Sequence, residues 1–329
     1  MKKLNRLVLF FVSIIVLSAI SCSTLNGIIG EPKISVSSVS LKSIDFEGIT
    51  FTCDYTITNP YPVAFSIDRV EADVSCSEKS IIKLAADEGI SVAAVNTRKN
   101  AFTFKVPYSA IMNFAGEYSA AKKSLPFTIA GNAYLDLSRS TGLELKSLRL
   151  PFSVSFEVPV FKPSFSISNP RIKMMSTSEF KEALVNGGIP VAKAVTIAAQ
   201  LASGKKLSEN FFDGIDLNLK FNFDLNIKNE GFSAWQCILD NCSIKTSGND
   251  LIDIALNKNE KITGSSAKVP VTATLNTLKA GKFIVQLLNK SGKDPVFSVD
   301  SKLAFPGLKY KSDIPLAYSC AIPLSKISK

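Results

Sequence analysis

The chain has 329 residues, of which 46% are apolar and 20% charged, so it is long enough for two folded domains and too apolar for a disordered protein. It contains no histidine, which excludes Ser/His/Asp and Cys/His catalysis, histidine-ligated metals and histidine pH switches. Lysine and arginine number 38 against 28 aspartates and glutamates, a net charge of +10. Because the lysines are scattered, we interpret this charge as a solvated basic surface, with attraction to anionic lipid as the alternative.

The amino-terminal residues 1–21 predict a secretory signal peptide. A basic segment is followed by the apolar stretch 7–20, which is shorter than the roughly 20 residues of a membrane-spanning helix. Small residues precede Cys22, and this arrangement resembles the lipobox of bacterial lipoproteins. The resemblance implies cleavage before Cys22 and its lipidation; the alternative is ordinary signal-peptidase cleavage at the same bond. Residues 22–31 would then tether the protein in the envelope of a diderm bacterium, facing the periplasm or exposed on the outer membrane.

Alternating side chains predict strands in the first half of the chain. Apolar residues occupy every second position from Ile49 to Ile57, a pattern typical of a strand with one packed face. Asn59, Pro60 and Pro62 follow directly. Because proline cannot donate to a strand ladder, we predict that these three residues form a structural turn at the end of the strand.

The same order of elements occurs twice. Residues 215–227 repeat the alternation, and the Val-Pro pairs at 106–107 and 269–270 align. Each copy has a helical patch, the second from Leu275 to Leu288. We therefore predict a mainly β protein with two tandem antiparallel β-sandwiches, residues 32–163 and 164–329, each with about seven strands and one helix.

An insertion at about residues 176–210 interrupts the second copy. It is predicted to be helical with a break at residues 187–190, which read Gly-Gly-Ile-Pro. Its apolar positions are spaced by three or four residues: Val191, Val195, Ala198 and Leu201. Either this stripe packs across the sandwich, or it is a candidate surface for a ligand, a partner or a membrane, with Lys193, Lys205 and Lys206 nearby.

Five cysteines remain besides Cys22: Cys53, Cys76, Cys237, Cys242 and Cys320. An odd number permits at most two disulfides. Cys237 and Cys242 cannot bridge each other within one regular strand, because ~3.3 Å per residue places them about 16 Å apart. Without histidine a metal site at this pair has little support, so we predict no metal and no cofactor. Cys53 and Cys320 fall on apolar sides of alternating patterns and are expected to be small buried hydrophobes.

The strands from residue 32 to 58, together with the Asn59-Pro60-Tyr61-Pro62 turn, resemble the group 2 late embryogenesis abundant proteins, the family that contains the water stress and hypersensitive response domain. The resemblance implies a folded β-sandwich of about seven strands with one helix, an association with desiccation or other stress, and no catalytic residues. It covers residues 32–163 well and 164–329 moderately, since the second copy has Glu230-Gly231 in place of the turn prolines.

The sequence contains no phosphate-binding glycine loop and no dinucleotide fingerprint, so we predict that the protein is not an enzyme. The main hypothesis is a lipid-anchored envelope protein whose sandwiches bind an envelope protein or a membrane surface. One alternative is a periplasmic carrier of lipid or another amphiphile, with a cleft along the apolar face of residues 215–227. Another is a surface-exposed adhesin. No nucleic-acid partner is expected.

Overall fold

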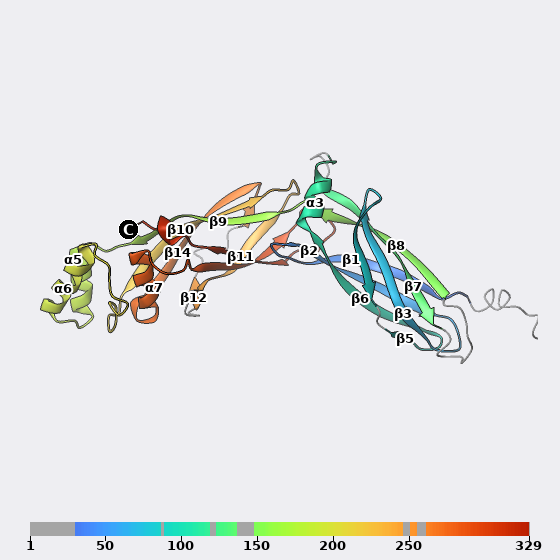
Figure 1. Ribbon diagram of the computed structural model, residues 1–329, viewed down its shortest axis with the longest axis horizontal. Helices are drawn as coiled ribbons and strands as arrows, with labels where there is room; N and C mark the ends of the chain where they lie inside the picture. The colour runs from blue at the N-terminus through green and yellow to red at the C-terminus, as the bar shows by residue number, and fades with distance from the viewer. Residues whose placement is uncertain are drawn as a thin grey trace, which may run out of the picture. The chain divides into compact units, whose positions relative to one another are not determined.

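The structure is a computed structural model, shown as a ribbon in Figure 1. It describes residues 30–86, 89–118, 123–136, 148–245, 251–254 and 261–328. The signal segment 1–21, Cys22 and the tether up to residue 29 lie outside the described residues. The chain divides into two compact units. Unit 1 comprises Met1–Ser40, Phe51–Phe104 and Pro126–Glu157; unit 2 comprises Leu41–Thr50, Lys105–Leu125 and Val158–Lys329.

Strands β1 to β8 form the first sandwich (Figure 1). One layer contains, in spatial order, β1 (Lys33–Ile44), β2 (Gly48–Asn59) and β6 (Asn96–Pro107). The other contains β4 (Lys79–Ala86), β3 (Phe65–Cys76), β7 (Ser124–Asp136) and β8 (Leu148–Pro159), and the short β5 (Ile90–Val92) also pairs with β3. Helix α3 (Tyr108–Ala115) follows β6 directly.

The alternation predicted for β2 is confirmed. Its apolar residues from Ile49 to Ile57 are at most 5% exposed, and the polar residues between them are half-buried. The two layers meet through aromatic rings: Phe156 of β8 packs against Phe51 and Phe104 of the other layer, with ring centroids 5.2 Å and 5.8 Å apart. Such contacts add to the hydrophobic stabilisation that buried rings provide.

The second sandwich has a three-stranded layer in the order β14 (Ser266–Asn276), β10 (Asn218–Asn229) and β9 (Pro163–Lys173). Its other layer contains β12 (Leu251–Ile254), β11 (Gln236–Lys245), β15 (Val296–Ala304) and β16 (Ile314–Ala321), with β13 (Lys261–Thr263) on β11. Helix α7 (Thr277–Asn289) follows β14, and the 3-10 turn η1 (Leu324–Lys326) follows β16. β16 also pairs in parallel with β1 at Ile44 and Leu316, which both belong to unit 2. The prediction of a mainly antiparallel β fold is therefore confirmed.

Two details of the predicted repeat are wrong. The two aligned Val-Pro pairs are not equivalent, because Pro107 directly precedes α3 whereas Pro270 lies within β14, opposite Asp224 of β10. β14 is an edge strand, where a missing backbone N–H is tolerated. Leu275 belongs to the same strand rather than to the helix, which begins only after the N-cap Asn276. Among the described residues, no helix has the length and apolarity that crossing a membrane requires.

The predicted helical insertion is a hairpin of two helices, α5 (Thr177–Asn186) and α6 (Val191–Ala202). α5 begins with a capping box, in which Ser176 and Glu179 each bond the other's backbone N–H. It ends at Gly187, Gly188 has a φ of +88°, and Pro190 is the N-cap of α6. The glycine and proline thus break the helix where the sequence predicted.

Candidate functional site

Asn59 is the most heavily bonded buried side chain of the predicted turn. It is 1% exposed, and its Oδ1 accepts a hydrogen bond from the Tyr61 N–H at 2.9 Å. Its Nδ2 donates to three backbone carbonyls at 2.9, 3.2 and 2.9 Å, respectively those of Val63, Val92 and Ala93. The side chain therefore closes its own turn and also holds the end of β5.

Asn229 occupies the same position in the second sandwich. Its Oδ1 accepts from the Gly231 N–H at 2.8 Å, and its Nδ2 donates to the Ser233 carbonyl at 3.3 Å. These partners are two and four residues ahead, as for Asn59. Gly231 stands where the first copy has Tyr61, and no larger residue fits there because a Cβ would lie 1.9 Å from the Val160 carbonyl oxygen. The buried asparagine is thus common to both copies, whereas Pro60, which is half-buried, and Pro62, which is exposed, occur only in the first.

Unit 1 exposes large apolar side chains at one end. Among its described residues these are Val63 at 40%, Val95 at 73% and Leu148 at 36% exposure, which we call the apolar tip. The Val95 N–H donates to the Tyr61 carbonyl at 2.9 Å, so both loops lie together. Val95 has a φ of +48°, a strained conformation for a β-branched residue. The structure therefore holds an apolar side chain in water at the cost of backbone strain.

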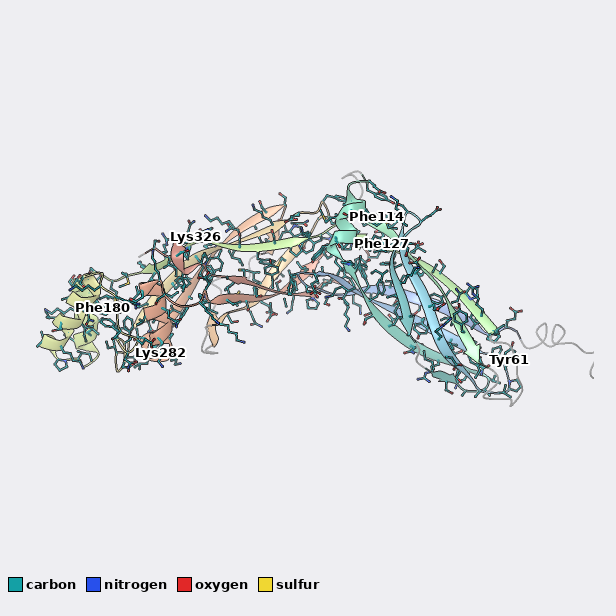
Figure 2. The ribbon with its side chains drawn as sticks, in the orientation of Figure 1. Tyr61, Phe114, Phe127, Phe180, Lys282 and Lys326 are labelled. Atoms are coloured by element: carbon teal, nitrogen blue, oxygen red, sulfur yellow. The ribbon has the colours of Figure 1, made fainter. Side chains whose placement is uncertain are left out.

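The described chain enters unit 1 at the same end. β1 begins at Lys33 alongside the end of β2, a register supported by the bond from Thr56 Oγ1 to the Ser35 carbonyl at 3.4 Å. Figure 2 labels Tyr61 at this end of the sandwich. Leu148 lies at this end as well. The contact between Thr128 of β7 and Ser155 of β8 at 3.3 Å places the start of β8 beside the end of β7, and the end of β7 pairs with the start of β3.

The α5–α6 hairpin separates the residues of the predicted stripe. α6 buries Ala198 at 3% exposure and half-buries Leu201, whereas Val191 and Val195 are 55% and 46% exposed. The four predicted residues therefore do not form one packed face of α6. The packed face consists of alanines, since Ala194 is fully buried as well. Small side chains let two helices approach closely, and α5 contributes the larger buried residues, including Phe180 (labelled in Figure 2).

The two exposed valines lie in a basic stretch of chain. Lys193, Lys205 and Lys206 are exposed, and no acidic residue occurs from Val191 to Ser208. The segment after α6 is fixed to α7 by Asn289, whose side chain bonds both the N–H and the carbonyl of Leu207 at 2.8 Å.

A cleft of about 290 Å³ opens in unit 1 between β4 and β6. These are edge strands of opposite layers. Twelve residues line it, nine of them apolar or aromatic, including Tyr55, Val70, Leu84, Ile90 and Phe102, and three of them polar: Lys83, Asn100 and Thr103. Val70 pairs with Ala86 and Ala72 with Leu84, so these four side chains point to the same face of their sheet. The inward lining is therefore mostly apolar.

Arg98 lies toward one end of this cleft. It precedes Asn100 and Phe102 by two and four residues on β6, so the three side chains share one face of the strand. Its guanidinium donates to the carbonyl of Ser91 at 2.6 Å, and Ser91 follows Ile90, which lines the cleft. Arg98 and the cleft have no signal in the sequence, because nothing local indicates that β4, β5 and β6 meet.

The apolar face of residues 215–227 is closed. Ile215 is 3% and Leu217 7% exposed, and every other apolar residue of the face is at most 2% exposed. Phe223 packs on Phe297 of the opposite layer at 5.2 Å between ring centroids. The expectation of a ligand cleft along this face is therefore wrong, because the facing layer and α7 fill the space.

The cysteines have the environment of core residues. Cys53, Cys237, Cys242 and Cys320 are free thiols, and all but Cys320 are buried. Burial, followed by the charge of Asp54, raises the pKa of the Cys53 thiol to about 11. A bulge between Leu239 and Asn241 breaks the alternation of β11, which places both Cys237 and Cys242 on its buried side. Burial raises their pKa values to about 11 and about 12. Such thiols are poor nucleophiles and ligands.

An ion-pair cluster fixes the β1–β2 turn. Lys105 Nζ lies 2.7 Å from Asp45 and 2.9 Å from Glu47, and Tyr108 donates its hydroxyl to the Asp45 carbonyl at 2.7 Å. Burial alone raises the pKa of Asp45, but bonds from Lys105 and from the backbone of Glu47 and Gly48 outweigh it and lower the pKa. Within the described part of the chain, no three Cys, Asp or Glu side chains are grouped as metal ligands would be.

Part of the first sandwich is similar to known proteins. Residues 54–156 match the family model described as late embryogenesis abundant protein. Among solved structures, the solution structure of AT1g01470 from Arabidopsis thaliana is 20% identical, covering 40% of this chain and 83% of that one, with a TM-score of 0.33. The solution structure of the late embryogenesis abundant protein At2g46140.1 is 15% identical, covering 47% and 87%, with a TM-score of 0.33. No match is found among curated proteins.

The family match begins in β2 and ends in β8, so it includes Asn59, the apolar tip and the cleft, and it stops before the second sandwich. The second sandwich lies outside the matched residues and shares with the first a buried asparagine, Asn229, at the end of a strand. Over residues 54–156, the first sandwich matches the late embryogenesis abundant family model, which supports the resemblance to the type 2 proteins expected from the sequence.

Proposed function

We propose that this protein is a non-enzymatic lipoprotein of a bacterial cell envelope, held at a membrane by a lipid on Cys22 and resting on it with the apolar tip. Its sandwiches bind an envelope partner. Protection against desiccation or another stress is the physiological role that the domain family suggests.

The apolar tip is the observation that carries this proposal. In the described part of unit 1, Val63, Val95 and Leu148 are the large apolar side chains left exposed, and all lie where the chain arrives from Cys22. A tether of residues 22–31 reaches at most about 35 Å. A lipid on Cys22 would hold this end of unit 1 close to the bilayer, where burial of the exposed apolar side chains of the tip adds to the attachment.

The test has two parts. Mass spectrometry of the amino-terminal peptide from native membranes should find a lipid on Cys22, and Cys22→Ala should abolish it; an unmodified peptide would overturn the anchoring. Tryptophan is then placed at the tip as Val95→Trp and, for control, at the far end of β3 and β4 as Lys79→Trp, both in a Trp235→Phe background. Brominated lipids should quench only the tip tryptophan. Equal quenching at both positions would refute contact through the tip.

The exposed part of α6 is the proposed partner surface. Val191 and Val195 are one turn apart and are neighboured by lysines without acids, which suits a partner with an acidic rim and a small apolar pocket. Recovery of envelope proteins after cross-linking should fall in Val191→Ser/Val195→Ser. The exposed alanines of the same helix provide the control, Ala192→Ser/Ala199→Ser, which should leave recovery unchanged. Equal recovery from both variants would exclude α6 as the surface.

A further inference from the structure

We infer that the cleft between β4 and β6 is a binding site for a single-chain anionic amphiphile of the fatty-acid class, with the acyl chain between the two layers and the carboxylate at Arg98. This site lies in the first sandwich, not on the closed face of residues 215–227, and it is independent of the lipid anchor.

The dimensions and lining favour one hydrocarbon chain. An apolar cavity of about 150 Å³ accepts a benzene-sized molecule, and this cleft measures about 290 Å³, which is too small for a two-chain lipid. Its inward side chains come from both layers: Val70 and Leu84 on one side, Tyr55 and Phe102 on the other. Phe102 of the lining packs against Phe104 at 6.1 Å between ring centroids, and Phe104 packs edge-on against Phe156 of the opposite layer at 5.8 Å, so the cleft borders the aromatic core.

The edges of the sandwich explain why the site is open. β4 is half-buried at Leu84, and Phe102 of β6 is also half-buried, whereas Phe104 two residues later is 4% exposed. An acyl chain that covers these half-buried apolar side chains removes further apolar surface from water, and this favours binding. A polar or doubly charged ligand would have to leave water for this lining without sufficient partners.

Arg98 selects the head group. Its bond to the Ser91 carbonyl spans the two layers at one end of the cleft and uses one of five guanidinium N–H donors. The planar fork that remains matches a carboxylate, for which arginine is a strong bidentate partner. Lys99, the next residue, points to the opposite face of β6. The cation and the apolar lining are therefore adjacent on one face of the strand.

The proposed contacts with the acyl chain are tested by isothermal titration calorimetry with octanoate, decanoate and dodecanoate. The protein used is residues 23–329, which include every residue that the structure describes. Affinity should rise about fourfold per added methylene and level off once the cleft is filled. Ala86→Phe, which points into the cleft, should weaken decanoate at least tenfold. Ala85 also borders the cleft, but the alternation of β4 places its side chain on the opposite face, so Ala85→Phe is the matched control and should bind nearly as the parent does.

Leu84→Ala enlarges the cleft and should move the levelling-off to a longer chain, a result that a merely misfolded variant cannot give. The head-group part is tested by Arg98→Gln, which should weaken decanoate by roughly tenfold or more and leave 1-decanol unchanged. Lys99→Gln controls for net charge and should have little effect. Equal decanoate affinity in Ala86→Phe and Ala85→Phe, or in Arg98→Gln and Lys99→Gln, would overturn the assignment.

Discussion

Replacing Asn59 by alanine should destabilise unit 1 by about 4 kcal/mol. The substitution removes four hydrogen bonds, those to Val63, Val92 and Ala93 and the one from Tyr61. Roughly 1 kcal/mol is expected for each part-buried bond and ~2 kcal/mol for the Val92 carbonyl, which stays buried without a partner. These values add to about 5 kcal/mol, and we reduce the total to about 4 kcal/mol because the two amide N–H groups are shared among three carbonyls.

The assay is urea unfolding followed by far-UV circular dichroism. The protein has one tryptophan, Trp235, which lies in unit 2, so its fluorescence separates the two units if they unfold at different urea concentrations. Asn96→Ala is the control, because exposed Asn96 makes one local bond to the Thr97 N–H, and it should cost less than 1 kcal/mol. If Asn59→Ala and Asn96→Ala unfold at the same urea concentration, the reasoning about the buried amide is wrong.

Three further outcomes are expected. Gly231→Ala should cost more than 3 kcal/mol or prevent folding, because its Cβ meets backbone, whereas Gly116→Ala, with its nearest neighbour at 4.0 Å, should change stability by less than about 1 kcal/mol; calorimetry would compare them. At pH 8, a thiol reagent should label Cys53 only after urea is added, since the pKa of about 11 leaves little thiolate; fast labelling in buffer would contradict its burial. Asp45, whose pKa is lowered, stabilises the fold above its unfolded pKa of about 3.9, and this contribution is lost as the pH falls through the folded value. Lys105→Met should therefore flatten the loss of stability below pH ~4, with a cost under 1 kcal/mol at neutral pH because Lys105 is 37% exposed; an unchanged pH profile would argue against the pair.

Local pattern was sufficient for much of the fold. The alternation from Ile49 to Ile57 predicts which side chains β2 buries, because successive side chains of a strand point to opposite faces. The break in the insertion was also readable, since glycine and proline limit a helix wherever they occur. The alignment of the two Val-Pro pairs was wrong, because a match of two residues does not show where a strand ends. β6 ends at Pro107, whereas β14 continues for six residues beyond Pro270.

The sequence by itself determined the alternating strands of a mainly β fold, the turn that begins at Asn59, and the absence of imidazole chemistry. Only the tertiary structure decided which apolar residues are covered. The face of residues 215–227 is closed by a layer distant in sequence, while Phe102 and Leu84 stay half-buried because β4 and β6 are edges that no strand among the described residues joins. The stripe on α6 was divided in the same way, since the packing of α5 against the alanines selects one face and leaves Val191 and Val195 in solvent. Side-chain period is a local property, but burial depends on which elements meet, and that is decided by the packing of the whole chain.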